Sequence, residues 1–143
     1  MPKSTPFSNS LLNLIFNAAA ISGLATNATT SPLTGLYVAL HTANPGTGGA
    51  QTTSEAAYTG YARVAVTRTT SGWTAASGGI TYAAVAISFP AATGGSETET
   101  FFSIGTAATG AGVVLYSGAI SPTILISNGV QPVLTAATSI AEA

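Results

Sequence analysis

The chain has 143 residues, no cysteine, and only three basic and four acidic side chains, for a net charge of −1. The length suits one domain, and the missing cysteines exclude a disulfide framework and a thiolate metal site. Two arginines and one lysine are too few for the phosphate-binding patch of a nucleic-acid-binding protein or for a polybasic membrane anchor.

Low charge is the most unusual property of this composition. Charged residues make up 5% of the chain, whereas globular proteins average about 25%. An uncharged surface at a net charge near zero associates, because nothing repels a neighbouring molecule. We therefore expect obligatory protein partners, including further copies of the chain.

The first 34 residues predict a helix followed by an extended linker. Leu12, Ile15 and Phe16 have the spacing of one apolar helix face, with N-cap oxygens at residues 8–10 and a C-cap at Gly23. We expect this helix to pack on the core or on a neighbouring subunit, so these three residues are candidate interface residues. No run reaches the 18 or so apolar residues that a membrane span needs, and we expect no membrane contact.

From Gly35 onward the periodicity changes from helical to alternating. Short segments rich in Val, Ile, Thr, Tyr and Phe alternate with Gly, Ser, Thr and Pro, which is typical of strands and turns. No helical pattern separates the segments, so the prediction is an all-β domain over residues 35–143, an antiparallel β-sandwich or jelly roll of seven or eight strands. The predicted strands are 35–41, 61–68, 79–89, 98–105, 112–119, 122–127 and 131–139, with a possible short one at 72–76.

Edge strands point to partners as well. Natural sheets protect their edges with lysine and inward charges, and the only lysine here is Lys3. Long uncharged edges therefore remain, and another protein is the simplest cover for them.

His41 is the only histidine and ends the strand Gly35–His41. Alternation places Tyr37 and His41 on the face away from the expected core. A zinc site needs more than one imidazole or thiolate, and no nucleophile motif accompanies this histidine. We interpret His41 as a strand-end side chain that bonds loop backbone or a neighbouring subunit.

Glu97 and Glu99 are the nearest approach to a paired-carboxylate site. On a strand they share one face about 7 Å apart, a spacing that glycosidases use. They leave a Gly-Ser loop, however, so a solvated rim is the preferred interpretation over catalysis or calcium binding. With no nucleophile motif, metal site or phosphate loop, we expect neither an enzyme nor a cofactor.

The remaining interface candidates are two arginines and two aromatic residues. Along the predicted strand Arg63 and Arg68 point to opposite faces of the sheet, so they do not bind one ligand together. Each is expected to pair with a carboxylate of its own or a neighbouring subunit. Tyr61 and Trp73 are candidates either for an interface or for the core.

Four segments resemble a family of small virion proteins from tailed bacteriophages. They are Gly35-Leu-Tyr-Val-Ala-Leu-His-Thr-Ala-Asn-Pro-Gly46, Tyr58-Thr-Gly-Tyr-Ala-Arg-Val-Ala-Val66, Ile87-Ser-Phe-Pro-Ala-Ala-Thr93 and Gly112-Val-Val-Leu-Tyr-Ser-Gly-Ala119. Members are labelled capsid decoration (cement) proteins or tail fibre proteins. The resemblance implies a β-sandwich or jelly roll in the mature particle and brings no catalytic residue.

Size and surface favour decoration over a fibre. Nothing in the chain supplies the repeated shaft of a fibre, whereas an uncharged contact surface resists screening by salt. We therefore expect a dimer or trimer that binds the major capsid protein on the outer surface of an icosahedral capsid. A tail or tail-fibre component that binds the host surface is the alternative.

Overall fold

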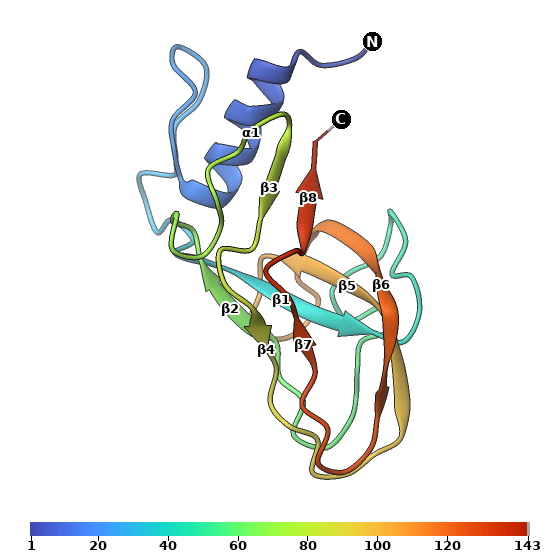
Figure 1. Ribbon diagram of the computed structural model, residues 1–143. Helices are drawn as coiled ribbons and strands as arrows, with labels where there is room; N and C mark the ends of the chain where they lie inside the picture. Colours follow the sequence, from blue (N-terminus) through green and yellow to red (C-terminus); the bar gives the residue numbers. More distant parts are fainter. Residues whose placement is uncertain (143) are drawn as a thin grey trace. The chain divides into compact units, whose positions relative to one another are not determined.

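A computed structural model describes residues 1–142 of the chain. One helix precedes eight strands (Figure 1). The helix is α1 (Thr5–Asn17) and the strands are β1 (Gly35–His41), β2 (Val64–Thr67), β3 (Ile80–Tyr82), β4 (Ile87–Ser88), β5 (Glu97–Gly105), β6 (Val114–Ile126), β7 (Val133–Leu134) and β8 (Ser139–Ala141).

Helix α1 begins and ends earlier than the sequence predicts. The Ser4 hydroxyl accepts a hydrogen bond from the Phe7 amide at the N-terminus, and a proline lies in the first turn, where it costs no hydrogen bond. At the other end Ala18 takes the left-handed conformation, with φ of 54°, and its N–H reaches the Asn13 carbonyl. The caps predicted at residues 8–10 and at Gly23 were therefore wrong, because Ser4 and Ala18 already satisfy the helix ends.

The strands form three small sheets. The largest has the order β2-β1-β5-β6, and the two others are the pairs β3-β8 and β4-β7. Strand β5 is antiparallel to β1, with His41 opposite Phe101, and antiparallel to β6, with Ser103 opposite Ser117. This confirms the predicted all-β class, an antiparallel β-sandwich with one short N-terminal helix.

Strand boundaries differ from the prediction in several places. The strand predicted at 61–68 shortens to β2, and the possible strand at 72–76 is reduced to an isolated bridge between Trp73 and Ala83. The segments predicted at 112–119 and 122–127 form the single strand β6. Conversely, 79–89 divides into β3 and β4, and 131–139 contains β7 and the first residue of β8. Each separated piece pairs with a different strand, and the alternation of apolar and polar residues does not indicate which strand will be the partner.

Helix α1 has 13 residues, and no helix among the described residues is long and apolar enough to cross a membrane.

The chain divides into two compact units. Unit 1 contains residues 1–35, 66–87 and 134–142, and unit 2 contains residues 36–65 and 88–133. In unit 1, α1 packs against β3 (Figure 1). Phe16 lies edge-on to Trp73 there, with ring centroids 4.8 Å apart. In unit 2, the core face of β1 is formed by Leu36, Val38 and Leu40, all almost completely buried. The sequence division at residues 34 and 35 stays a prediction, and its last residue, 143, lies outside the described range.

Arg68 holds unit 1 together through main-chain oxygens. Its guanidinium donates to the carbonyls of Leu14, Ile15 and Leu33 at 2.6–2.8 Å. It also donates to the Asn27 side chain at 2.9 Å. Among the described residues Arg68 has no carboxylate partner, so the predicted ion pair does not form within the chain, and a pair with a neighbouring subunit stays a prediction. The positive charge instead meets the C-terminal carbonyls of α1, where the helix dipole is negative.

We expect Arg68→Ala to lower the free energy of unfolding by roughly 2 to 4 kcal/mol, because four acceptors lose a charged donor. Arg68→Lys should restore only part of the lost stability, since an ammonium group cannot make the several directed hydrogen bonds of the planar guanidinium. Urea titration measures the effect. Lys3→Ala is the matched control, because the Lys3–Glu142 pair of unit 1 is partly solvated and worth under about 1 kcal/mol. Equal losses in Arg68→Ala and Lys3→Ala would contradict this role.

Candidate functional site

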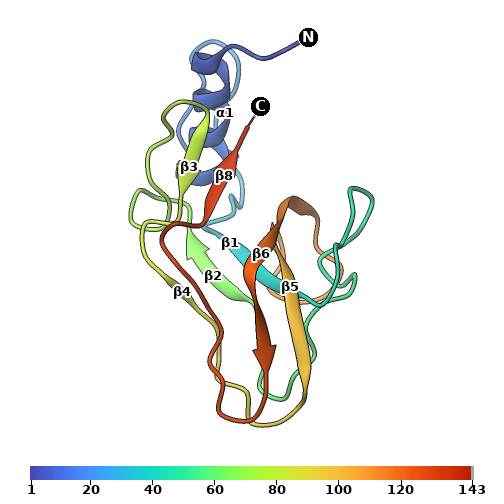
Figure 2. The same cartoon turned by 45° about the vertical axis from the view of Figure 1, so that its right-hand side comes forward.

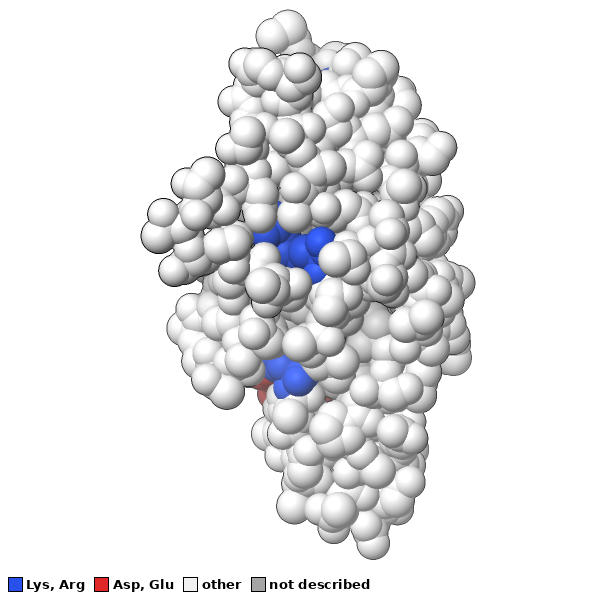
Figure 3. All heavy atoms as spheres, turned by 90° about the vertical axis from the view of Figure 1, so that its left-hand side faces the viewer, with Lys and Arg blue, Asp and Glu red and all other residues white. Residues whose placement is uncertain are grey.

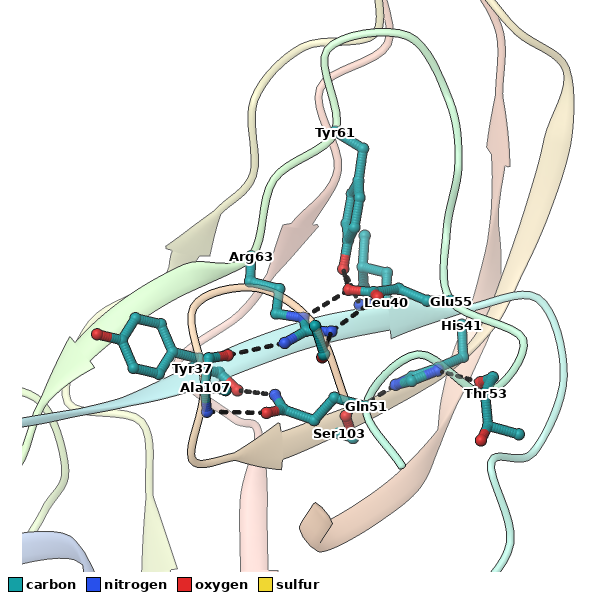
Figure 4. Close-up of polar contacts among 11 residues, drawn as sticks. Tyr37, Leu40, His41, Gln51, Thr53, Glu55, Tyr61, Arg63, Ser103 and Ala107 are labelled. Carbon is teal, nitrogen blue, oxygen red and sulfur yellow. Dashed lines mark hydrogen bonds and ion pairs between the residues drawn. The ribbon is translucent and has the colours of Figure 1, made fainter. Parts of the chain in front are cut away.

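Unit 2 contains a network of hydrogen-bonded polar side chains (Figure 4). At its centre Arg63 binds Glu55 in a two-pronged pair, with Nε–Oε1 at 2.6 Å and Nη2–Oε2 at 2.8 Å. Two further guanidinium hydrogens go to the carbonyls of Ala107 and Gly110, at 2.8 and 2.7 Å. The predicted carboxylate partner of Arg63 is thus confirmed within the chain. The hydrogen bonds to Glu55 raise the pKa of Arg63.

Tyr61 links this pair to strand β1. Its hydroxyl donates to Glu55 Oε1 at 3.0 Å and accepts the Leu40 amide at 3.1 Å. Burial, with a smaller contribution from Glu55, raises the pKa of Tyr61. The phenol therefore stays a hydrogen-bond donor at every physiological pH. Its ring stacks on Phe89, so the same side chain joins the polar network to the apolar core.

Gln51 joins strand β1 to the loop that contains Ala107. Its amide group donates to the Tyr37 carbonyl at 3.2 Å and accepts the Ala107 amide at 2.9 Å. The side chain is completely buried and lies against Gly105 and Gly112, where an added β-carbon would overlap it. A side chain at either position would therefore displace the Gln51 amide from its partners.

His41 is buried and bonded on both sides (Figure 4). Nδ1 lies 2.8 Å from the Thr53 carbonyl, which only accepts, so Nδ1 carries the proton. Nε2 then accepts the Ser103 hydroxyl at 2.7 Å. Burial lowers the pKa of His41, which keeps the imidazole neutral. The predicted bond to loop backbone is confirmed.

The Ser103–His41 pair has the distance of a nucleophile and its general base. The third member, however, is the Thr53 carbonyl where a hydrolase uses a carboxylate. Both side chains are completely buried, so no substrate reaches the Ser103 oxygen. The geometry supports a structural bridge between β1, β5 and the segment that contains Thr53.

Glu97 and Glu99 share one end of β5 but have different surroundings. Glu97 Oε1 accepts the amides of Ala57 and Tyr58, both at 2.8 Å. Glu99 is completely buried, and neither of its carboxyl oxygens has a hydrogen-bond partner among the described residues. The predicted solvated rim was therefore wrong for Glu99. Glu97 binds the segment with Ala57 and Tyr58 to this end of β5.

Burial raises the pKa of Glu99 to about 8, and the adjacent Glu97 carboxyl adds to the effect. Glu99 is thus protonated at neutral pH. Burial raises the pKa of Tyr58 to about 12, with a contribution from both glutamates. Nowhere in residues 1–142 do three or more His, Asp or Glu side chains gather as a metal site would require.

The residues predicted for an interface fall into two groups. The side chains of Leu12, Phe16, His41 and Trp73 are completely buried within the chain itself. The side chain of Arg63 is only 3% exposed. The others are half-buried, namely Ile15, Tyr37, Tyr61 and Arg68. Their role in contacts with other chains stays a prediction.

Sequence reasoning missed Gln51, Ser103 and Glu55 as members of the network. Ser103 lies in a strand predicted for its apolar residues, and Gln51 lies in a loop. Only Glu55 carried a signal, since it is one of four possible partners for Arg63.

The surface is nearly uncharged. On the face drawn in Figure 3 charged atoms reach the surface only in small patches. Exposed apolar side chains include Leu24, Val85, Val113 and Leu125, each more than 60% exposed. The chain thus places most of its charge in internal bonds and shows uncharged surface to its surroundings.

Comparison with known families identifies the class of protein. A family model described as Podophage GP4 fiber I protein gp80 matches residues 2–140. The match covers nearly the whole chain, so the chain belongs to this family and is a phage virion protein. No curated protein matches it.

We expect Glu99 to make stability fall as pH rises. Its folded pKa of about 8 lies above the ordinary 4.5, so its contribution is complete below pH 4.5 and is lost as pH rises to about 8. Relative to wild type, Glu99→Gln should gain about 1.4 kcal/mol per pH unit across this window. Urea titrations at each pH measure this difference.

The comparison between variants removes the opposing effect of His41, whose lowered pKa weakens the fold on acidification. Glu142→Gln, in unit 1, is the matched control and should follow the wild-type curve through the upper part of the window. A constant difference between Glu99→Gln and wild type at all pH values would show that Glu99 is ionised in the folded chain.

Proposed function

We propose that the chain is a structural subunit of a fibre on the phage particle, assembled from copies of itself and attached to other virion proteins. The observation that carries this proposal is the family match over residues 2–140, whose description names a fibre protein. Within unit 2 the polar side chains bind one another and the backbone. This arrangement suits a subunit whose task is mechanical.

The uncharged surface supports assembly in particular. Contacts between apolar and small polar groups are not weakened by salt, whereas exposed ion pairs are screened within about 10 Å at 0.1 M salt. Such contacts survive the varied ionic conditions that a particle meets outside its host. Low charge also removes the repulsion that keeps ordinary soluble proteins apart.

Capsid decoration is the second candidate, and one observation favours it. The sequence has no internal repeat of the kind that builds a fibre shaft. A compact β-sandwich with uncharged surfaces is sufficient for a cement protein between subunits of the major capsid protein. In that case the chain would lie on the outer surface of the head.

Purified particles of the encoding phage distinguish the two candidates. Gel densitometry against the major capsid protein should show a small fraction of its amount if the chain belongs to a fibre, and near parity if the chain is a cement. Gold-labelled antibody against the chain should mark an appendage rather than the whole head. Uniform labelling of the head at near parity would overturn the fibre proposal, and absence from the particle would overturn both.

A further inference from the structure

Asn128 differs from the other asparagines of the chain in its surroundings. Five asparagines hold their side chains in hydrogen bonds, namely Asn9, Asn13, Asn17, Asn27 and Asn44. Asn128 is exposed, and its side chain has no hydrogen bond to any of the described residues. An exposed side chain without a partner changes rotamer within nanoseconds. Its amide group is therefore free to approach the neighbouring main chain.

A tight turn between β6 and β7 contains this asparagine. The Val130 amide donates to the Ser127 carbonyl at 3.0 Å, and Gly129 has a φ of 90°. Such a φ is typical of the third residue of a type II turn, where glycine is favoured. Glycine also lacks a β-carbon, so no side chain shields the main-chain nitrogen that follows Asn128. The turn thus places a freely rotating amide next to an unshielded nitrogen.

One hydrogen bond restrains the Gly129 nitrogen. Its N–H donates to the Ala92 carbonyl at 2.7 Å, so the segment that links β6 to β7 runs beside the segment that follows β4 (Figure 2). The Gln131 side chain adds a bond to the Phe89 carbonyl at 3.1 Å. A main-chain nitrogen must lose its proton before it attacks a carbonyl carbon, and an acceptor that holds this proton slows the loss. Reaction at Gly129 therefore requires the turn to open, which costs least in exposed loops.

We propose that Asn128 is a site of spontaneous deamidation whose rate is set by the opening of this turn. The Gly129 nitrogen loses its proton and forms a bond to the side-chain carbonyl carbon of Asn128, and the side-chain nitrogen leaves as ammonia. Water then opens the resulting succinimide ring at one of its two carbonyls, which yields aspartate or isoaspartate. Water is the only other reactant.

The modification changes a property that this chain keeps low. Each event adds one negative charge to a chain whose net charge is −1. The new carboxylate lies in an exposed turn, and residues 123–133 around it contain no charged side chain. Like charges on neighbouring copies repel each other, so deamidation opposes association through this part of unit 2. The reaction does not depend on whether the assembled protein is a fibre or a cement.

Peptide mapping tests the proposal directly. Purified protein is incubated at mildly alkaline pH, either folded or unfolded in urea, and digested with chymotrypsin, which should release peptide 126–134 with Asn128 as its only asparagine. Mass spectrometry measures the conversion of amide to acid, and enzymatic methylation detects isoaspartate. In the folded chain Asn128 should convert before any other asparagine. Its conversion should be about tenfold slower than in urea, as expected for an exposed turn that opens locally.

The chain contains its own controls. Asn27 is bonded to Arg68, and Asn44 precedes Pro45, which has no N–H and does not form the ring. Both asparagines should stay unmodified in the folded chain over the same period. Gln131→Ala removes the bond to the Phe89 carbonyl. It should speed conversion of Asn128 about threefold in the folded chain, the effect of one lost hydrogen bond, and leave the rate in urea unchanged.

Four results would overturn the proposal. Conversion of another asparagine of the folded chain before Asn128 would exclude the assigned site, and so would complete protection of Asn128 in the folded chain. Equal rates in the folded chain and in urea would exclude control by the turn. An unchanged rate in folded Gln131→Ala would exclude it as well.

Discussion

The Glu55–Arg63 pair is the interaction on which unit 2 depends. The guanidinium reaches the carbonyls of Ala107 and Gly110, and the carboxylate reaches Tyr61, which in turn binds the Leu40 amide. Two charged side chains therefore join β1, the segment before β2 and the loop between β5 and β6. The two side chains are only 3% and 16% exposed, so solvent screens their attraction little, and a lost partner would leave an uncompensated buried charge.

Arg68 and Glu97 follow the same rule. Arg68 binds the carbonyls at the end of α1, and Glu97 binds two backbone amides. In this chain, which has few charges and no cysteine, guanidinium and carboxylate groups hold the long loops in place through hydrogen bonds to backbone carbonyls and amides. The consequence is a surface with little charge left over, which is the property that suits a protein made to assemble in a virion.

The fold class and the strand at Gly35–His41 could be predicted because alternation and turn residues are local signals. The same local reasoning found a carboxylate partner for Arg63 but not which glutamate it would be. It failed at Glu99, because burial there depends on the distant segment at Ala57 and Tyr58 crossing the end of β5. It also failed at Gln51, whose partners lie 14 and 56 residues away in the chain.

The division between β3 and β4, and the fusion that produced β6, were likewise set by pairing partners far apart in sequence. The helix ends were local but were assigned to the wrong oxygens, since several serines and asparagines near the N-terminus are equally good caps. Long-range pairing therefore decided what the sequence pattern left open.

A double-mutant cycle on Glu55 and Arg63 tests the central claim most directly. Urea unfolding of wild type, Glu55→Gln, Arg63→Met and the double variant gives the coupling free energy between the two side chains. The account predicts a coupling above about 1.5 kcal/mol that hardly changes between low and high salt, as expected for a buried pair bonded to the backbone. A coupling below about 0.5 kcal/mol, or one that salt abolishes, would mean that the pair is an ordinary surface ion pair and that the fold rests on something else.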